Sequence, residues 1–443
     1  MANKIRKFLK KREIEWVRIL WCDNANVIRG KAFHTAFLEE HQEQGIGISI
    51  AQQAVPVMYD AVVPGSGLAP VGEVWLRPDW STLQALPYSP GSARVLGDLV
   101  QRGKPWAFCP RGFLRRMVAQ AEEMGLHIMA AFENEFYLLQ PGVELEPVDQ
   151  TLFASTFGMD LQAPVIREMA QALIQQGIPV ERYYPEGGPG QQEIAIRYSD
   201  ALQAADRQIV FRETIRGVAL NHNMRASFLP KIFEMQSGNG CHLHFSLWQQ
   251  GQNLMPSLTA PWELSKMGRS FVAGLLHHLP ALMALTTPSV NSYRRLQPHA
   301  WSGAFRCWGM DNREAAVRIP SNPTLPSPTH IELKTADASA NPYLALGGAI
   351  AAGLDGIRQN MTLGEPVAVD PGHWSEAERQ ELGIDRLPRD LGEAIAHLSQ
   401  NSLLLEALGS ELAQAYLAVR KAEWEFFKDW NLADEAKLLL ERY

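Results

Sequence analysis

The segment at residues 127–139 constrains this fold most, because an apolar, strand-like sequence carries two acidic side chains at its centre. Its middle reads Phe132-Glu133-Asn134-Glu135-Phe136. Side chains two positions apart on a strand share a face, so Glu133 and Glu135 would point one way and the aromatic rings the other. Two adjacent carboxylates repel each other unless they bind a cation or one stays protonated. The pattern indicates a metal-binding strand inside a sheet or, alternatively, an edge strand with a solvated acidic face.

The chain length of 443 residues and the 46% hydrophobic content predict two domains. Residues 1–104 are expected to form a small β-rich domain. Strand-like runs at residues 16–21 and 27–33 flank turn-forming residues 23–26, which predicts a hairpin. A short strand is expected at residues 75–77, closed by Pro78 and Asp79.

Residues 105–443 are expected to form an α+β catalytic domain, because helical and strand-like segments alternate along them. Helices are predicted at residues 111–124, 165–176 and 199–221, with Gly125 and Gly177 ending the first two. Strands are predicted at residues 127–139, 179–184 and 241–248. From about residue 266 the chain is expected to be mostly helical around loops at residues 289–328.

The composition favours a small-molecule substrate and places the protein in a reducing compartment. The 48 acidic and 41 basic residues give a net charge of −7, which argues against a nucleic-acid partner. Four dispersed cysteines do not form a disulfide framework or a zinc knuckle, so we expect a cytoplasmic protein. The basic N-terminus lacks a signal-peptide core, and the apolar stretches are too short or too interrupted to span a membrane.

Two further segments carry groups that could bind a metal. In the glycine-rich run of residues 186–193, Glu186 and Glu193 could face a common point from the two ends of a tight loop, although an ordinary surface turn is the alternative. No phosphate-binding loop of the G-x-x-x-x-G-K type is present. His242 and His244 share a face of a predicted strand and could ligate a metal or contact phosphate, or else simply pack there.

A fourth group is rich in arginine. Arg295, Arg313 and Arg318 lie in loops or at predicted strand ends, and Lys334 follows in Ile331-Glu332-Leu333-Lys334. Guanidinium groups match carboxylate and phosphate oxygens with two parallel hydrogen bonds, which suits a substrate that carries both. Surface salt bridges are the competing explanation.

Taken in this order along the chain, these four groups of residues resemble those of the glutamine synthetase family. The resemblance extends from the hairpin and Arg29-Gly30-Lys31 to Ala340-Asn341-Pro342-Tyr343-Leu344. It implies an N-terminal β-grasp domain and a catalytic α+β domain. It also implies a homo-oligomeric ring, expected to be a dodecamer, with active sites between neighbouring subunits, and the use of ATP, glutamate and Mg²⁺ or Mn²⁺.

The resemblance also implies roles for individual residues. The metal ligands would be Glu135, Glu186 and Glu193 for one ion and Glu133, His242 and Glu332 for a second. The nucleotide contacts would be Glu181, Ile196, Arg197, Tyr198, His244, Ser246 and Arg318. The contacts to glutamate and phosphate would be Gly238, Arg295, Arg313 and Lys334.

The implied reaction begins with transfer of a phosphoryl group from ATP to the γ-carboxylate of glutamate, because a carboxylate is a poor electrophile. The two cations would neutralise the transferring group, and Arg313 would stabilise the charge that develops on it. Arg295 would orient the α-carboxylate so that the γ-carboxylate lies in line with the phosphate. A nitrogen nucleophile would then attack the acyl phosphate.

The sequence departs from the family where the nucleophile binds. Trp301 stands in place of the glutamate of the flap, the loop at residues 296–303, and residues 47–53 contain no acid where an aspartate is expected. An indole cannot take a proton from ammonium, but its face holds an organic cation by roughly 0.5–2 kcal/mol. These two changes predict an amine nucleophile and a γ-glutamyl amide product, with His299 as a candidate proton acceptor.

Other departures concern recognition and regulation. Lys334 replaces an arginine and so loses the fork that binds two oxygens at once. The tyrosine that some bacterial members adenylylate is not recognisable around residues 383–390. The alternatives to an amine ligase are an ordinary glutamine synthetase that uses ammonia and a non-catalytic ring-forming relative.

Overall fold

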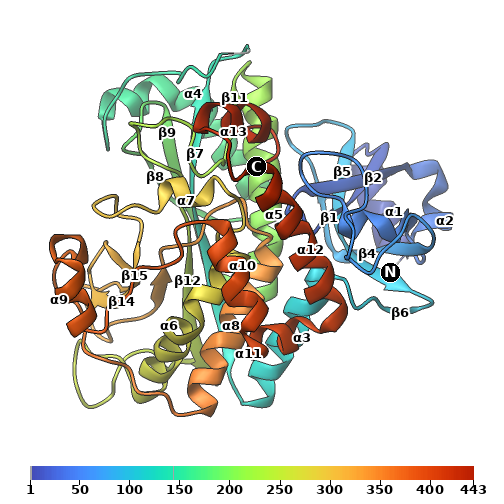
Figure 1. Ribbon diagram of the computed structural model, residues 1–443. Coiled ribbons are helices and arrows are strands. Elements are labelled where there is room, and N and C mark those ends of the chain that lie inside the picture. The colour runs from blue at the N-terminus through green and yellow to red at the C-terminus, as the bar shows by residue number, and fades with distance from the viewer. Residues whose placement is uncertain (1, 143) are drawn as a thin grey trace.

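The computed structural model describes residues 2–142 and 144–443. In Figure 1 the N-terminal sheet, drawn in blue, lies to one side of a larger part in which a long sheet is covered by helices. Helices α3 (Pro110–Glu123) and α12 (Ser410–Phe427) lie on the side of this larger part that faces the N-terminal sheet. The chain has the mixed α+β fold that the sequence predicts.

The N-terminal sheet has the strand order β2-β1-β5-β4-β3, with β6 paired to β5. Its strands are β1 (Trp16–Cys22), β2 (Ile28–His34), β3 (Ile46–Ser49), β4 (Glu73–Ala85), β5 (Ser92–Gln101) and β6 (Lys104–Pro105). Strands β1 and β5 are parallel, and the remaining pairs are antiparallel. Helix α1 (Ala2–Lys11) adds Ile5 and Leu9 to the core of this sheet. Short helical turns follow at η1 (Thr35–Phe37), α2 (Leu38–His41) and η2 (Ile50–Ala54).

The predicted hairpin is confirmed by the antiparallel pair β1 and β2, but the predicted strand at residues 75–77 is too short. Strand β4 continues through Pro78 to Ala85. Its pairing with β3 stops at Leu76, so beyond that residue β4 has β5 as its partner. A proline without an N–H is tolerated there because that side of the strand needs no donor.

The larger sheet has the strand order β14-β15-β16-β12-β7-β9-β8. These strands are β7 (His127–Leu139), β8 (Val180–Pro185), β9 (Gln191–Ile196), β12 (Cys241–Gln249), β14 (Phe305–Met310), β15 (Ala315–Ile319) and β16 (Ile331–Leu333). The short strands β10 (Ser199–Asp200) and β11 (Arg225–Ser227) pair with β7, and β13 (Gln252–Asn253) pairs with β12. Because β7 lies between β12 and β9, the edge-strand interpretation of the two central glutamates is wrong.

Helices cover the apolar face of this sheet. The longer ones are α4 (Thr156–Gln175), α5 (Ala201–Asn221), α6 (Lys266–Thr286) and α8 (Pro342–Arg358). The shorter helices of this part of the chain, not all of which lie on that face, are α7 (Ser292–Arg295), η3 (Pro371–His373), α9 (Glu376–Glu381), α10 (Leu391–Gln400), α11 (Ser402–Leu408) and α13 (Leu432–Leu439). Phe136 of β7 packs on Phe211 of α5, with ring centroids 6.4 Å apart. Helices α6 and α8 approach so closely that a Cβ at Gly274 would stand 2.3 Å from the carbonyl oxygen of Ala352.

Most predicted elements of this part are confirmed, with three corrections. Helix α4 begins nine residues earlier than predicted, at Thr156 rather than residue 165. Residues 199 and 200 pair as strand β10, so α5 begins at Ala201. The segment 289–328, predicted as loops, contains β14 and β15, which pack on Val367 and Ile384 from much later in the chain.

Candidate active site

The two glutamates of β7 occupy the face of the strand opposite the helices. Along β7 the even-numbered residues from Ile128 to Leu138 are buried in the core, because a strand alternates its side chains between two faces. Glu133 and Glu135 therefore point away from that core. This alternation follows from the geometry of a β-strand and does not depend on the tertiary fold.

The strand register brings the other predicted metal ligands beside these two carboxylates. His242 of β12 lies opposite Glu133, and Glu193 of β9 lies opposite Glu135. Glu332 of β16 lies opposite His244 of β12. Directly opposed positions place side chains close enough to interact. Four strands that are distant in sequence thus contribute to one cluster.

Contacts within the cluster confirm that these groups lie together. The Nδ1 atom of His242 is 3.3 Å from Glu133 Oε1 and 3.1 Å from Glu332 Oε1. Its Nε2 atom is 3.9 Å from Glu135 Oε1. The Nε2 atom of His244 is 3.3 Å from Glu133 Oε2. Glu133, His244 and Glu332 each present a ligand atom within 4.8 Å of the others, so His244 also belongs to this cluster.

Glycines allow the backbone to close around the cluster. The N–H of Gly240 donates a 2.9 Å hydrogen bond to Glu135 Oε2, and a Cβ at Gly240 would stand 2.5 Å from His242 Nε2. In the loop between β8 and β9, a Cβ at Gly188 would stand 1.9 Å from the Tyr137 hydroxyl. The close packing of this loop holds Glu186 at the cavity that adjoins the cluster.

The carboxylates divide into two electrostatic groups. Burial alone would raise the pKa of Glu133, but hydrogen bonds from His242 and His244 hold that pKa well below its usual range. The pKa of Glu332 is also lowered, because the charge of Lys334 and the hydrogen bond from His242 outweigh burial. The N–H groups of Arg318 add a 2.9 Å contact to Glu332 Oε2.

The other two carboxyl groups, Glu186 and Glu193, favour their protonated forms. Burial and then the charge of Glu135 raise the pKa of Glu186 to about 7. Burial and then the charges of Glu133 and Glu135 raise the pKa of Glu193 to about 10. The Tyr184 hydroxyl donates a 2.6 Å hydrogen bond to Glu193 Oε1, a contact that the sequence interpretation missed although Tyr184 lies opposite Glu193 on β8.

This donor set fits divalent metal ions. Clustered carboxylates that repel one another in the absence of a cation are stabilised when one binds. The predominance of carboxylate oxygen over nitrogen suits Mg²⁺ or Mn²⁺ better than zinc. The residues present could hold two such ions, divided between them as the resemblance to the family implies.

A cavity of about 480 Å³ adjoins the cluster and contains the predicted substrate residues. Its walls include Gly238, Arg295, Arg313, Lys334 and Trp301 together with five of the six predicted metal ligands. The sixth ligand, Glu332, is fully buried behind them. Arg295 is itself buried and donates a 3.1 Å hydrogen bond to the Ala336 carbonyl.

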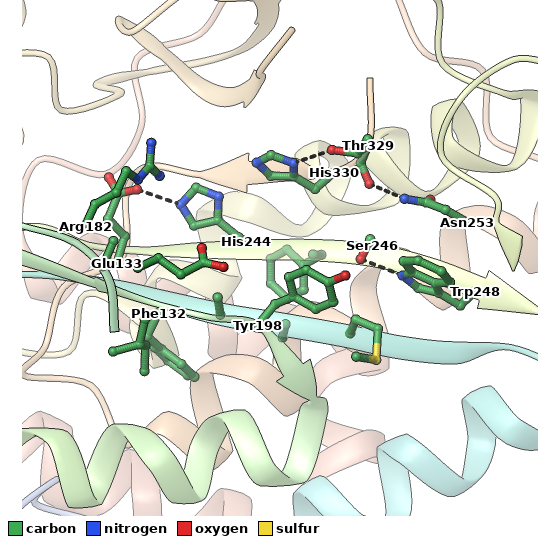
Figure 2. Close-up of a pocket in the computed structure, with 17 residues that line it drawn as sticks. Phe132, Glu133, Arg182, Tyr198, His244, Ser246, Trp248, Asn253, Thr329 and His330 are labelled. Carbon is green, nitrogen blue, oxygen red and sulfur yellow. Dashed lines mark hydrogen bonds and ion pairs between the residues drawn. The ribbon is translucent and has the colours of Figure 1, made fainter. Parts of the chain in front are cut away.

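A second cavity, of about 320 Å³, lies on the other side of Glu133, which lines both. Figure 2 shows Tyr198, Ser246 and His244 around it. Of the seven predicted nucleotide contacts, five line it, namely Glu181, Ile196, Tyr198, His244 and Ser246. The other two, Arg197 and Arg318, form ion pairs with Glu181 at 3.1 Å and Glu332 at 2.9 Å instead.

His330 is a cavity residue that the sequence interpretation missed. It lines the second cavity, with its ring centroid 5.2 Å from that of His244. Burial and then the nearby His244 lower the pKa of His330 to about 4. Its position two residues before Glu332 is the sequence signal that could have identified it.

The structure separates the two flap residues that the sequence interpretation placed together. The side chain of Trp301 lines the first cavity, and Trp301 is 64% exposed. His299 lines a different hollow, where its Nδ1 atom is 2.6 Å from Asp370 Oδ2. The buried Glu314, also missed, accepts a 2.7 Å hydrogen bond from the Trp301 N–H.

Within residues 2–142 and 144–443, the helices are too short or too polar to cross a membrane.

Two family models match consecutive parts of the chain. A model of the glutamine synthetase N-terminal domain matches residues 1–106, and a model of the glutamine synthetase catalytic domain matches residues 107–437. The type-1 glutamine synthetase 1 of Dictyostelium discoideum is 33% identical over 469 residues, which cover 100% of this chain and 93% of that protein. The γ-glutamylpolyamine synthetase GlnA3 of Streptomyces coelicolor is 37% identical over 418 residues, which cover 93% and 90%. A solved complex of GmaS with ADP has a TM-score of 0.85 at 28% identity and covers 98% of this chain and 99% of that one.

Proposed function

The chain belongs to the glutamine synthetase family of ATP-dependent glutamate ligases, and we propose that it joins glutamate to an organic amine through a γ-glutamyl phosphate. One observation carries the choice of nucleophile. The wall of the substrate cavity presents the indole of Trp301, at the position where the sequence resemblance implies a glutamate. The 37% sequence identity to a γ-glutamylpolyamine synthetase supports the same choice.

The two cavities suggest how the substrates share the site. The nucleotide would lie in the cavity lined by Tyr198 and Ser246, with its terminal phosphate directed toward Glu133. Glutamate would lie in the cavity lined by Arg295 and Arg313. Since Glu133 lines both, the γ-carboxylate and the terminal phosphate would meet beside the carboxylate cluster.

The protein side chains would then position the reacting groups. Divalent ions, when bound to the six ligands, would neutralise charge on the phosphates. Arg313 would stabilise the charge that develops during phosphoryl transfer, and Arg295 would orient the α-carboxylate. The face of Trp301 would hold the cationic or apolar part of the amine.

We further propose a homo-oligomeric ring, with a dodecamer as the expected assembly. The segment of residues 47–53 belongs to β3 and η2 of the N-terminal part and lines neither cavity of its own chain. A neighbouring subunit would have to supply that segment to the site. Size-exclusion chromatography with light scattering tests this, and a monomer that retains full activity would refute it.

The proposed reaction is tested by measuring phosphate release with ATP, Mg²⁺ or Mn²⁺, glutamate and a panel of nucleophiles. We expect faster turnover with at least one primary amine or polyamine than with ammonia. Equal turnover with ammonia and the best amine would favour an ordinary glutamine synthetase. No turnover with any nucleophile would favour a non-catalytic relative.

A further inference from the structure

A second group of metal-ligating side chains lies outside the proposed active site. It consists of His299 on the flap and Asp370 and His373 at η3. Each of the three offers one ligand atom, and these atoms lie within 4.8 Å of one another. The nearest pair is His299 Nδ1 and Asp370 Oδ2 at 2.6 Å, and His373 Nε2 lies 4.0 Å from the same oxygen.

We propose that these three residues form a binding site for a borderline divalent cation such as Zn²⁺ or Co²⁺, which ties the flap to η3. Two imidazole nitrogens and one carboxylate oxygen are a ligand set that such ions favour. It contrasts with the oxygen-rich cluster of the active site. Ligand bonds of about 2.0–2.2 Å would place the ion between the two rings, with a coordination position left for water.

The surrounding backbone holds the three side chains in this arrangement. The Oδ1 atom of Asp370 accepts a 2.7 Å hydrogen bond from the Gly372 N–H, which leaves Oδ2 directed at the imidazoles. Such outer hydrogen bonds orient metal ligands in known sites. A Cβ at Gly372 would stand 2.6 Å from His299 Cε1, so this close approach requires glycine.

The flap backbone is strained where it carries the ligand. His299 has a φ of 61° and Trp301 a φ of 54°, and both values lie in the left-handed region that non-glycine residues rarely adopt. Strain of this kind persists where surrounding contacts compensate for it. A cation bound by His299 would supply one such contact.

The site is connected to the substrate cavity through two hydrogen bonds. The side-chain N–H₂ group of Asn312, next to Arg313, donates a 3.0 Å hydrogen bond to the carbonyl of Val369, which precedes Asp370. On the flap side, the N–H of Trp301 is held by Glu314. A cation that joins His299 to η3 would therefore restrict the flap that carries Trp301, and it would prevent His299 from accepting the proton of the amine.

Cobalt titration in excess Mg²⁺ tests the site without any measurement of turnover. The excess Mg²⁺ competes for the active-site cluster, whose His242 and His244 could otherwise also bind Co²⁺. Co²⁺ bound by two histidines gives a visible absorption band. We expect one Co²⁺ per chain in the wild type and in the control His397→Asn, which removes an exposed histidine of α10. His373→Asn should weaken the binding by at least about tenfold. Equal titration of the wild type and His373→Asn would overturn the site.

Chymotrypsin cleavage after Trp301 tests the restriction of the flap. We expect Zn²⁺ to slow this cleavage in the wild type and in His397→Asn but not in His373→Asn. A cleavage rate that Zn²⁺ leaves unchanged in the wild type would overturn the tie between flap and η3. Neither experiment depends on which nucleophile the enzyme uses, so failure here is distinguishable from failure of the proposed function.

Discussion

Trp301 is the residue on which the choice of nucleophile depends. It is 64% exposed, yet its backbone N–H is fixed by Glu314 and its side chain lines the cavity that contains Arg313. Trp301→Glu would replace an aromatic face with a carboxylate that attracts ammonium and other small cations. We expect kcat/KM for bulky amines to fall by about tenfold, which corresponds to loss of roughly 1.4 kcal/mol, while turnover with ammonia rises.

A matched control is Trp262→Glu, which replaces another exposed tryptophan with a positive φ, outside both cavities. This variant should keep the amine preference of the wild type. Steady-state kinetics with ammonia and with the best amine compare the two variants. The same amine preference in Trp301→Glu as in the wild type would show that the flap position does not select the nucleophile.

Glu314 acts on the nucleophile only through the flap, so we regard it as a positioning residue. Hydrogen bonds to charged groups contribute about 1.5–3 kcal/mol, and Glu314→Ala removes the acceptor of the Trp301 N–H. We expect KM for the amine to rise by about tenfold or more, with KM for ATP unchanged. Glu314→Gln keeps an acceptor oxygen and should restore most of the loss. Equal increases in both KM values would contradict this role, because they would indicate general damage to the fold.

At the scale of elements, strand β9 and the loop before it hold two carboxyl groups whose protonation opposes metal binding. In the metal-free protein the pKa of Glu186 is raised from its ordinary 4.5 to about 7 and that of Glu193 to about 10, by burial and then by neighbouring carboxylates. Because these pKa values are raised, the metal-free fold loses stability from pH 4.5 up to about pH 7 for Glu186 and about pH 10 for Glu193, since the unfolded chain releases these protons first. A cation that binds the ionised forms must displace their protons.

We therefore expect the affinity for Mn²⁺ to increase by at least about tenfold between pH 6 and pH 8 and its binding to release protons. Calorimetry in two buffers with different ionisation enthalpies measures both quantities. Removal of the metal with EDTA should lower the melting temperature, and by more at pH 8 than at pH 6. A dissociation constant that is the same at pH 6 and pH 8 would show that Glu186 is already ionised without the metal.

The sequence predicted those elements and site residues whose surroundings follow from the pattern of neighbouring residues in the chain. Strand β7 has the predicted bounds because apolar and aromatic residues recur from one end of the strand to the other. Strands β14 and β15 were missed because they are short and are buried by Val367 and Ile384, a contact that only the fold creates. His299 was placed beside Trp301 for a similar reason, since its proximity in sequence says nothing of Asp370, which draws it to a different hollow.

At the scale of the whole molecule, one buried arginine joins the two parts of the chain. Arg111 of α3 contacts Asp79 of β4 and Asp98 of β5, each at 2.9 Å, and Asp206 of α5 at 2.7 Å. The Tyr343 hydroxyl of α8 donates a further 2.7 Å hydrogen bond to Asp206. The N-terminal sheet is thereby attached to the helices that cover the catalytic sheet.

The contribution of Arg111 to the stability of the fold can be compared with that of a nearby arginine that shares two of its partners. Arg115 also contacts Asp79 and Asp98, but its side chain is 43% exposed, whereas that of Arg111 is 3% exposed. Removal of one partner from a buried ion pair costs about 3–5 kcal/mol, because the other charges stay buried without compensation. Exposed pairs contribute about 0–1 kcal/mol. Arg111→Met should therefore shift the urea midpoint of unfolding far more than Arg115→Met, and similar shifts would mean that water already screens the charges between the two parts.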